Sequence, residues 1–443
     1  MVFFIPFSGT AIVNIGSADS ASGVQPSIYF GCLWITSEFL RTPGGHRFRL
    51  SHNMRVPSYL LAAFTLVVLL SLVMPIWING RLVIESAELQ TGGSAPLAFT
   101  GRHITQTFYL LYGIVLTIFV GVKNSDFQAF RESLRILFVS SIFASLWGFL
   151  QWFCYAFEIP YPSSVFNTSA TPGAQGYMTA FAELGLRRIS SVSTEPSIFA
   201  QYMLVAVVFM SFTVLARQVV ISEFWDRVSL CLGVSVLLLT TSLTAYLGLA
   251  TLIVFSVIGL WYSRILAGRH VTLLAGFTLG VYLLYVTSPV VQEFVATQLL
   301  SKPETYSGLE RLGSVLLARD YFLRYPVLGV GWGSVTSHDL IFKLLSNTGI
   351  LGLLSFSIFI AWLLYQLCRT LARHSRSVSD LRVYAVLCSL VATIILLIIN
   401  ILTGFAFVYG YLWFVLGVAL AAPSWPARPQ PMPAVQPTTR SSL

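Results

Sequence analysis

The chain has 443 residues, of which 56% are hydrophobic and only 10% are charged, and its formal net charge is +9. So few charges cannot cover the surface of a water-soluble fold of this length, which excludes a soluble globular protein and indicates a multispanning membrane protein. Apolar stretches of about 17 to 25 residues recur along the chain without the alternating pattern of a barrel, so an all-α polytopic membrane fold is predicted.

About twelve membrane-spanning helices are predicted from these stretches. The first has no basic flank and no cleavage site, so it is interpreted as a short helix and not as a removed signal peptide. The spans define a membrane domain over 1–422, and the proline-rich segment 423–443 is expected to be a disordered cytoplasmic tail. The approximate boundaries of the spans are 3–15, 24–40, 56–78, 105–122, 136–154, 198–216, 228–241, 244–262, 271–288, 349–367, 383–402 and 408–422.

The basic residues predict how the chain is oriented in the membrane. With both termini in the cytoplasm, the loops and the tail on that side hold 17 of the 26 Lys and Arg residues, and these loops are short, where the positive-inside rule is most reliable. The net charge is therefore an orientation signal and a contact for anionic lipid, and no nucleic-acid partner is indicated. These residues are Arg41, Arg47, Arg49, Arg55, Lys123, Arg131, Arg135, Arg217, Arg227, Arg264, Arg269, Arg369, Arg373, Arg376, Arg382, Arg428 and Arg440.

Cofactor and metal signals are absent from the sequence. The five cysteines have no paired spacing and are interpreted as small apolar residues. There is no Asp-x-Asp and no His-x-x-x-His spacing, so neither a metal nor another cofactor is predicted.

Three outer segments, 79–104, 155–197 and 289–348, are longer than a simple connection requires, which is typical of functional loops. In the third, residues 309–324 have helical apolar spacing that predicts an amphipathic helix at the membrane surface, ended by Tyr325-Pro326. Arg311, Arg319 and Arg324 are interspersed along this helix, against the trend that keeps arginines inside.

The stretch GVGWGSVTSHDLIFKLLSNTGILG follows, from Gly329 to Gly352. Its first glycines permit tight turns, and Ser337 is the predicted N-cap of a helix that begins with His338 and Asp339 and ends near Gly349. Eleven helical residues cover about 16 Å, which places His338 at the outer membrane boundary. A histidine near several guanidinium groups suits acid–base chemistry on a phosphorylated substrate.

Simpler interpretations of the same residues remain open. The histidine can be a helix residue bonded to a neighbour, and the arginines can extend to lipid headgroups. The flanking aromatics could stack on sugars or belong to an aromatic belt at the interface; they are Tyr306, Tyr321, Tyr325 and Trp332.

The middle loop contains the basic pair Arg187 and Arg188 shortly before an apolar run. A basic pair outside the membrane could bind a diphosphate. Thr194, Glu195 and Pro196 are also explained by a helix start with a hydroxyl cap and proline in the first turn.

At these residues the sequence resembles the superfamily of O-antigen polymerases and ligases, which contains Wzy-type polysaccharide polymerases and WaaL-type ligases. Its pattern is a histidine, then Asn, Ser or Gln, nine residues, a glycine, two residues, and Gly, Thr or Tyr. His338, Gly349 and Gly352 keep this spacing, and Asp339 is the departure from it. The preceding YPVLGVGWG resembles the approach to that histidine in the family.

Two further positions carry the resemblance. Arg188 to Ser197 resembles an "R-x-S-G-x-x-x-E-P-S" run that is more typical of polymerases than of ligases, with Ser191 in place of the glycine. Arg311 occupies the position of a family arginine. A family "S-R-T" segment appears as Ser242-Leu243-Thr244 without the arginine, so its role is not transferred.

The resemblance implies a metal-independent glycosyltransferase in the bacterial inner membrane. It would take an oligosaccharide from undecaprenyl diphosphate on the periplasmic side and join it to a sugar hydroxyl of another lipid-linked repeat unit, alongside a flippase and a chain-length regulator. Arg188 and Arg311 would hold the diphosphate, and His338 would bind it or act as a base. The further candidates for substrate binding are Arg187, Glu195, Arg319, Arg324 and Asp339.

Three alternatives stay open. A ligase would transfer the glycan to lipid A-core. A different glycosyltransferase could take its base from Glu85 or Glu88 in the first outer loop, although these glutamates also fit a solvated helix face. A flippase or other transporter would explain the helices without chemistry, but the charges gather in outer loops and not inside the spans.

Overall fold

The structure is a computed structural model of the whole chain, and it describes residues 1–15, 22–40, 50–85, 93–170, 180–181, 186–262, 286–289, 292, 296, 306–373, 381–403 and 407–424. The predicted disordered tail lies outside these residues except for 423–424, and the predicted span 271–288 lies outside them except for 286–288.

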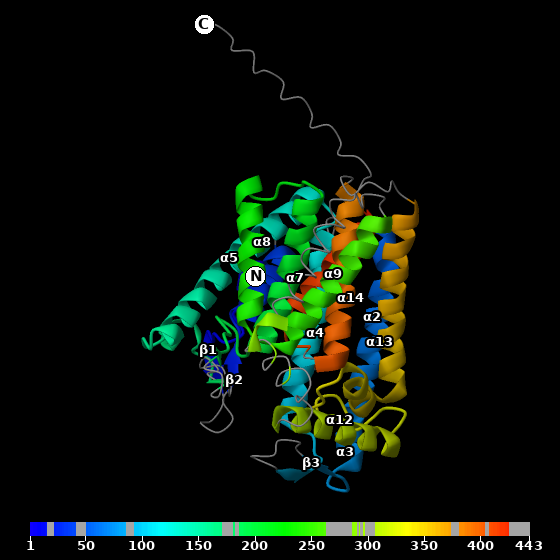
Figure 1. Cartoon of the computed structure of the whole chain (residues 1–443). Coiled ribbons are helices and arrows are strands. Elements are labelled where there is room, and N and C mark those ends of the chain that lie inside the picture. The colour runs from blue at the N-terminus through cyan, green and yellow to red at the C-terminus, as the bar shows by residue number, and fades with distance from the viewer. Residues whose placement is uncertain are drawn as a thin grey trace, which may run out of the picture.

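The described chain is mostly a bundle of helices (Figure 1), and six helical stretches in it are long and apolar enough to cross a membrane. This is the architecture of an all-α membrane protein. The six are α2 (His52–Ser71) continued by α3 (Val73–Ile78), α4 (Gly101–Lys123), α5 (Phe127–Ala156), α7 (Pro196–Leu215), α13 (Leu340–Arg373) and α14 (Leu381–Thr403).

Further helices complete the bundle, so the described residues contain fewer long apolar spans than predicted. The predicted spans at 24–40, 228–241, 244–262 and 408–422 correspond to helices outside these six. These are α1 (Pro26–Leu40), α8 (Glu223–Leu239), α9 (Leu243–Tyr262) and α15 (Gly410–Ala421), and the remaining short elements are α6 (Ser163–Phe166), η1 (Val2–Phe4) and η4 (Ala422–Ser424).

The prediction of a helix over 3–15 is wrong. Only Val2–Phe4 forms one 3-10 turn, and Val13–Ile15 is the strand β1. Pro6 and Gly9 interrupt the apolar run, and the backbone bonds to distant segments instead: Gly9 N–H donates to Val192 O at 3.0 Å. This segment is therefore held by tertiary contacts and local turns, and the hydrogen bonds of a continuous α-helix do not form.

Three short antiparallel hairpins also occur among the described residues, which the all-α prediction did not include. They pair β1 (Val13–Ile15) with β2 (Ser22–Val24), β3 (Val83–Glu85) with β4 (Ser94–Pro96), and β5 (Ala180–Phe181) with β6 (Leu186–Arg187), in the registers Val13↔Val24, Val83↔Pro96 and Ala180↔Arg187.

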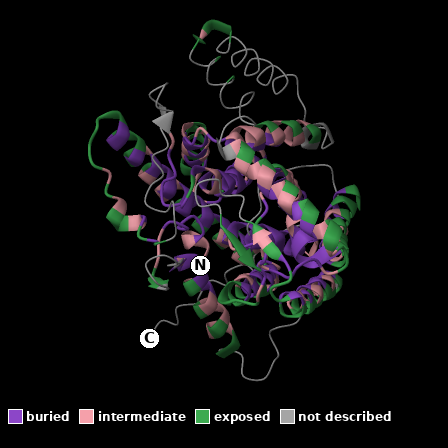
Figure 2. Cartoon of the chain, turned by 90° about the horizontal axis from the view of Figure 1, so that it is seen from below, coloured by how far each residue is buried: buried purple, intermediate pink, exposed green. Residues whose placement is uncertain are grey.

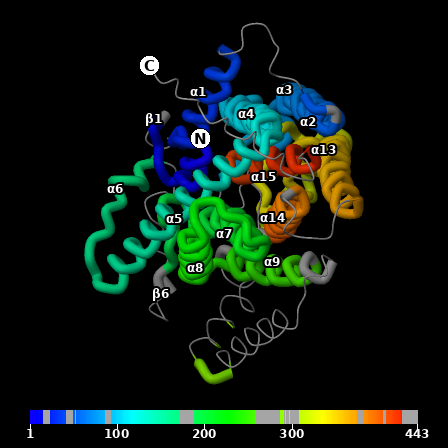
Figure 3. The backbone as a smooth tube through the Cα atoms, turned by 90° about the horizontal axis from the view of Figure 1, so that it is seen from above, coloured from blue at the N-terminus to red at the C-terminus, as the bar shows by residue number. Residues whose placement is uncertain are grey.

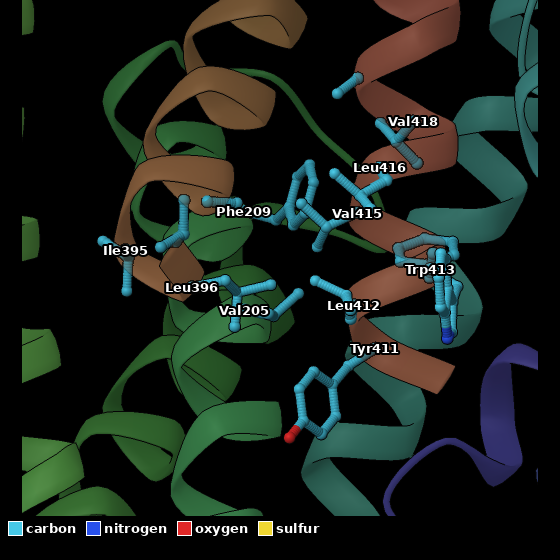
Figure 4. Close-up of a cluster of buried hydrophobic side chains, with 14 of the residues drawn as sticks. Val205, Phe209, Ile395, Leu396, Tyr411, Leu412, Trp413, Val415, Leu416 and Val418 are labelled. Atoms are coloured by element: carbon cyan, nitrogen blue, oxygen red, sulfur yellow. The ribbon is translucent and has the colours of Figure 1, made fainter. Parts of the chain in front are cut away.

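The apolar core is centred on α15, and every residue of this helix is buried. Seen along the bundle, α15 lies between α4, α13, α14 and α7 (Figure 3). Side chains of α7 and α14, such as Val205, Phe209 and Leu396, meet those of α15 (Figure 4). Buried residues accordingly gather in the middle of the bundle, while exposed residues lie on its outer faces (Figure 2).

The two ends of the bundle differ. At one end, α12 (Tyr306–Arg324) lies across the helices beside α3 and β3 (Figure 1), and we call this the α12 end. The opposite end carries basic residues close to helix termini: Lys123, Arg131, Arg217, Arg227, Arg369, Arg373 and Arg382. Because the long helices alternate in direction, Arg188, Arg311 and His338 all lie toward the α12 end.

Candidate functional site

The glycine turn that leads to His338 passes closely between three helices. Gly329, Gly331 and Gly333 have φ of 64°, 104° and 91°, a backbone region that L side chains rarely adopt. A Cβ at Gly329 would lie 2.4 Å from the carbonyl oxygen of Ser346, and one at Gly331 would lie 2.4 Å from the ring of Pro75. The turn therefore needs glycine both for its dihedral angles and for its close approach to α13 and α3.

The turn is also fixed by the side chain of Asn347 in α13, which is 1% exposed. Its Oδ1 accepts hydrogen bonds from the N–H groups of Gly333 and Val335, both at 3.1 Å, and its Nδ2 donates to Val335 O at 3.0 Å. Two residues later α13 breaks at Gly349, whose φ of 64° and ψ of −165° are not helical. The predicted end of this helix near Gly349 is thus a kink inside one longer helix.

The helix after the turn begins at Leu340, and Asp339 is its N-cap. The Asp339 carboxylate accepts the N–H of Phe342, whereas no described partner bonds the buried hydroxyl of Ser337. The prediction that Ser337 caps the helix with His338 and Asp339 in its first turn is therefore wrong, because the carboxylate outcompetes the hydroxyl. Burial raises the pKa of Asp339. Asp, Asn and Ser are all good N-caps, so Asn or Ser at this position would keep the capping chemistry.

His338 is held against α12 by Ser314. The Ser314 Oγ donates to Arg311 O at 2.8 Å, accepts the backbone N–H of His338 at 3.2 Å, and lies 3.0 Å from His338 Nδ1. A hydroxyl has one proton, so once it is donated to Arg311 O, Nδ1 of the neutral ring is the donor to Ser314. The lone pair that can accept a proton is then on Nε2.

An open cavity of about 280 Å³ lies beside this histidine at the α12 end. Its walls come from the β3–β4 hairpin, the start of α4, α12 and the glycine turn. The ionisable or hydroxyl-bearing residues among its lining are Glu85, Thr100, Arg102, His103, Glu310, Ser314, Ser334, Thr336 and His338.

The arginines of α12 lie at different places around the site. Arg311 is half-buried and precedes Ser314 by three residues, and its backbone carbonyl accepts from Ser314, but its side chain does not line the cavity. Arg319 is half-exposed and pairs with Asp320 at 3.0 Å, and Arg324 is exposed. Neither Arg319 nor Arg324 lines the cavity.

The helix α12 is confirmed, and its two faces have different surroundings. Ser314, Ala318 and Tyr321 are buried, and the Tyr321 hydroxyl accepts from Glu85 N–H at 2.8 Å, which joins α12 to the hairpin. The leucines face away from the protein instead, as expected for a helix at a lipid surface. Their exposed fractions are 50% for Leu309, 54% for Leu312, 42% for Leu316 and 66% for Leu323.

The middle-loop residues lie apart from this cavity and do not line it. Arg188 Nε donates to Thr240 O at 3.4 Å, at the turn between α8 and α9. Glu195 is exposed at the N-cap position of α7, where its carboxylate accepts from Ser197 Oγ at 3.0 Å. Arg187 is in β6, and its side chain lies outside the described part of the structure.

Ser191 adopts a backbone conformation that usually favours glycine. Its φ is 53°, and it is fully buried. Gln151 Oε1 accepts its N–H at 2.7 Å, and its own hydroxyl donates to Ala144 O at 2.7 Å. The turn therefore requires a left-handed residue, and these hydrogen bonds let serine occupy it.

Sequence reasoning missed the basic residues that α4 and α13 contribute. Arg102 donates to Thr336 Oγ1 at 2.7 Å, and His103 Nε2 lies 3.0 Å from Ser334 Oγ. Lys343 follows Asp339 by one helical turn, and like Arg102 it lines a cavity next to the glycine turn. The signal that could have found them is the one that singled out Arg188, namely a basic residue near the start of a helix in an outer segment.

Trp332 is not available to sugars. Its side chain is 2% exposed and packs edge-on against Phe64 and Phe407, with ring centroids 6.5 and 5.1 Å away. Tyr321 is likewise buried and bonded to the hairpin. Among the described residues, no group of three or more His, Cys, Asp and Glu side chains is placed to hold a metal ion.

No protein-family model matches the sequence, and no curated protein matches it. The function is therefore argued from the residues and their arrangement.

Proposed function

We propose that the protein is a polysaccharide polymerase: a membrane glycosyltransferase that moves an oligosaccharide from a polyprenyl diphosphate, undecaprenyl diphosphate in bacteria, to a hydroxyl of a second lipid-linked repeat unit. The observation that carries the proposal is His338, which Ser314 orients beside a cavity at the end of the bundle away from the basic helix termini. By the positive-inside rule, that end faces outward from the cytoplasm, where such donors are used.

The proposed reaction needs one proton acceptor and a stabilised leaving group. The acceptor hydroxyl gives its proton to Nε2 of His338 as its oxygen forms a bond to the anomeric carbon. The bond from that carbon to the diphosphate oxygen breaks, and the polyprenyl diphosphate leaves with the electron pair. Arginine suits the stabilisation of that charge because its paired donors match phosphate oxygens, and Arg311 is the candidate near His338.

Arg188 has a different place in this proposal. Its hydrogen bond to Thr240 puts it at the turn between α8 and α9, and it does not line the His338 cavity. We therefore assign Arg188, with Arg187 and Glu195, to binding the diphosphate or glycan of the second lipid-linked molecule. Arg319 and Arg324, on the exposed side of α12, are assigned to contacts with the phosphates of the carrier lipid or its neighbours.

The polymerase is favoured over the ligase by the segment Arg188 to Ser197, whose resemblance is to polymerases. The two activities differ in their products. Loss of a polymerase leaves single repeat units on the carrier or at the cell surface, and loss of a ligase leaves long polymer that is not attached to lipid A-core. A chain-length regulator and a flippase are the expected partners of a polymerase.

The experiment is a complementation assay in cells that lack the protein. We expect His338→Ala and Arg311→Ala to reach the membrane at normal levels and to abolish long glycan chains, because loss of a group that stabilises developing charge typically reduces rates about 10²–10³-fold. Arg227→Ala is the control, since Arg227 is exposed at the opposite end and pairs with Glu223. Normal chain lengths in both site variants would refute the proposed function.

A further inference from the structure

A second, smaller cavity adjoins the one at His338. Its volume is about 140 Å³, and Arg102, Gly333, Val335 and Thr336 line both cavities. These four residues therefore form a wall that the smaller cavity shares with the cavity at His338. Its remaining lining residues are Gln106, Trp332, Lys343, Asn347, Phe407 and Val408.

The charges are divided unequally between the two cavities. The described lining of the smaller one has two cations, Arg102 and Lys343, and no carboxylate, whereas Glu85 and Glu310 line the larger one. Two positive charges at one small cavity raise each other's electrostatic energy, and an anion between them lowers it. The hydrogen bond from Arg102 to Thr336 at 2.7 Å holds the guanidinium in the shared wall.

A buried neutral donor adds an independent observation. The indole N–H of Trp332 has no hydrogen-bond partner among the described residues, although the side chain is 2% exposed. A buried N–H without an acceptor is unfavourable. The packing of its ring against Phe64 and Phe407 fixes the indole in the cavity wall. An acceptor oxygen inside the cavity would satisfy this group.

We propose that the smaller cavity binds a phosphate-class oxyanion. Lys343 contributes a point charge, Arg102 contributes paired donors from the shared wall, and the indole of Trp332 contributes a neutral hydrogen bond. The proposal goes beyond glycosyl transfer, because it requires only an anionic ligand. Two sources carry this chemistry: the phosphate groups of a lipid-linked substrate and the headgroup of an anionic phospholipid.

The test is the binding of inorganic diphosphate to the purified full-length protein in a neutral detergent. Isothermal titration calorimetry and thermal unfolding measure this binding. We expect saturable binding that weakens about tenfold or more in Arg102→Gln and in Lys343→Gln, because each variant removes a hydrogen bond to a charged group. Trp332→Phe keeps the ring and loses the N–H, so it is expected to weaken binding several-fold.

Two controls keep the result interpretable. Lys343→Arg retains the charge and should retain binding, and Arg227→Gln removes an exposed cation at the opposite end and should bind as the wild type does. Absence of saturable binding by the wild type, or equal affinity in the wild type, Arg102→Gln and Lys343→Gln, would overturn the proposal.

A competition experiment separates the two sources. Inorganic diphosphate is displaced with a short-chain polyprenyl diphosphate or with phosphatidylglycerol vesicles, and phosphatidylcholine vesicles are the blank. Displacement by the first assigns the site to a lipid-linked substrate, displacement by the second assigns it to a headgroup, and displacement by neither contradicts a membrane ligand. Normal glycan chains together with lost diphosphate binding in Lys343→Gln would leave the anion site intact and remove it from the polymerase.

Discussion

The segments 188–196 and 329–343 lie toward the same end of the bundle and contain similar residue types, but their polar groups have different uses. In the first, hydroxyls and backbone groups bond to other parts of the protein: Ser193 Oγ donates to Pro6 O at 2.7 Å, and Thr194 N–H donates to Ser8 Oγ at 3.1 Å. In the second, charged side chains line two cavities. Similar motifs can therefore have their hydroxyls bonded within the protein in one loop and their charged side chains lining cavities in another.

The largest expected loss of stability comes from adding a side chain where segment 329–343 passes close to α3. Gly331→Ala should destabilise the protein by about 3 kcal/mol or more, because it combines an unfavourable φ with a clash. The new Cβ would lie 2.4 Å from Pro75. Thermal unfolding in detergent measures the effect, and Gly80→Ala is the matched control, since its φ is also positive but nothing lies within 4 Å of its Cβ position. Equal stability of the two variants would contradict the close approach.

The conformation of segment 188–196 should depend almost as strongly on Gln151 of α5. Its Oε1 accepts the N–H groups of Ser190 and Ser191 at 2.9 and 2.7 Å, and the side chain is fully buried. Gln151→Leu should lower the free energy of unfolding by about 2–4 kcal/mol, because two buried donors lose their acceptor. The adjacent, exposed Leu150 provides the control Leu150→Ala, and a variant of Gln151 as stable as that control would show that the segment does not depend on these bonds.

Ser314 should affect activity more than stability. Ser314→Ala removes the group that orients His338, and we expect about a tenfold loss of glycan polymerisation because a mispositioned base loses part of its contribution. The limb of the pH–rate profile that reports the histidine should move, and Ser314→Thr, which keeps the hydroxyl, should restore it. An unchanged profile in Ser314→Ala would reduce Ser314 to a packing role.

Asp339 should give a pH-dependent effect. Because burial raises its pKa above the ordinary value of 3.8, ionisation opposes folding, and this loss of stability develops as the pH rises through the folded-state pKa. Asp339→Asn keeps the cap without the charge, so it should be more stable than the wild type at pH 7 and lose this advantage in acid. Asp339→Ala should cost about 1 kcal/mol through loss of the cap. Unfolding of the three proteins across pH measures both effects.

The smallest effect is expected at Ser191. Ser191→Gly relieves the left-handed strain but removes the hydrogen bond to Ala144, and these terms, each about 1 kcal/mol, should nearly cancel. Ser193→Gly has only the loss of its bond to Pro6, since Ser193 is not among the residues with positive φ. It should therefore be the less stable variant, and the reverse order would contradict the backbone argument.

The parts of the fold that sequence could predict are those set by local pattern. Hydropathy placed the long helices, the Tyr325-Pro326 pair correctly predicted the end of α12 at Arg324, and Gly349 correctly predicted a break. Apolar periodicity could not tell which face of α12 is buried, because leucines facing lipid look the same in sequence as leucines facing a core.

The cavity cations could not be found by local pattern because their partners are remote. Arg102 meets Thr336 across 234 residues, and His103 meets Ser334 across 231. The choice between Ser337 and Asp339 as the cap also depends on geometry, since both residue types are good N-caps. The catalytic and binding roles of His338, Arg311 and Arg188 stay predictions until the variants are measured.

The docking of residues 6–9 has a consequence for the order of folding. Ser8 pairs with Thr194, which is 186 residues further along the chain, and Gly9 also accepts from Ser169. The helices α1, α2, α4 and α5 must therefore be synthesised before this segment can meet all its partners. Contacts between residues so far apart in the sequence form slowly. Until then Phe3, Phe4 and Phe7 lack the aromatic cluster that later encloses them. Early intermediates therefore leave the polar groups of Ser8 and Gly9 without these distant partners.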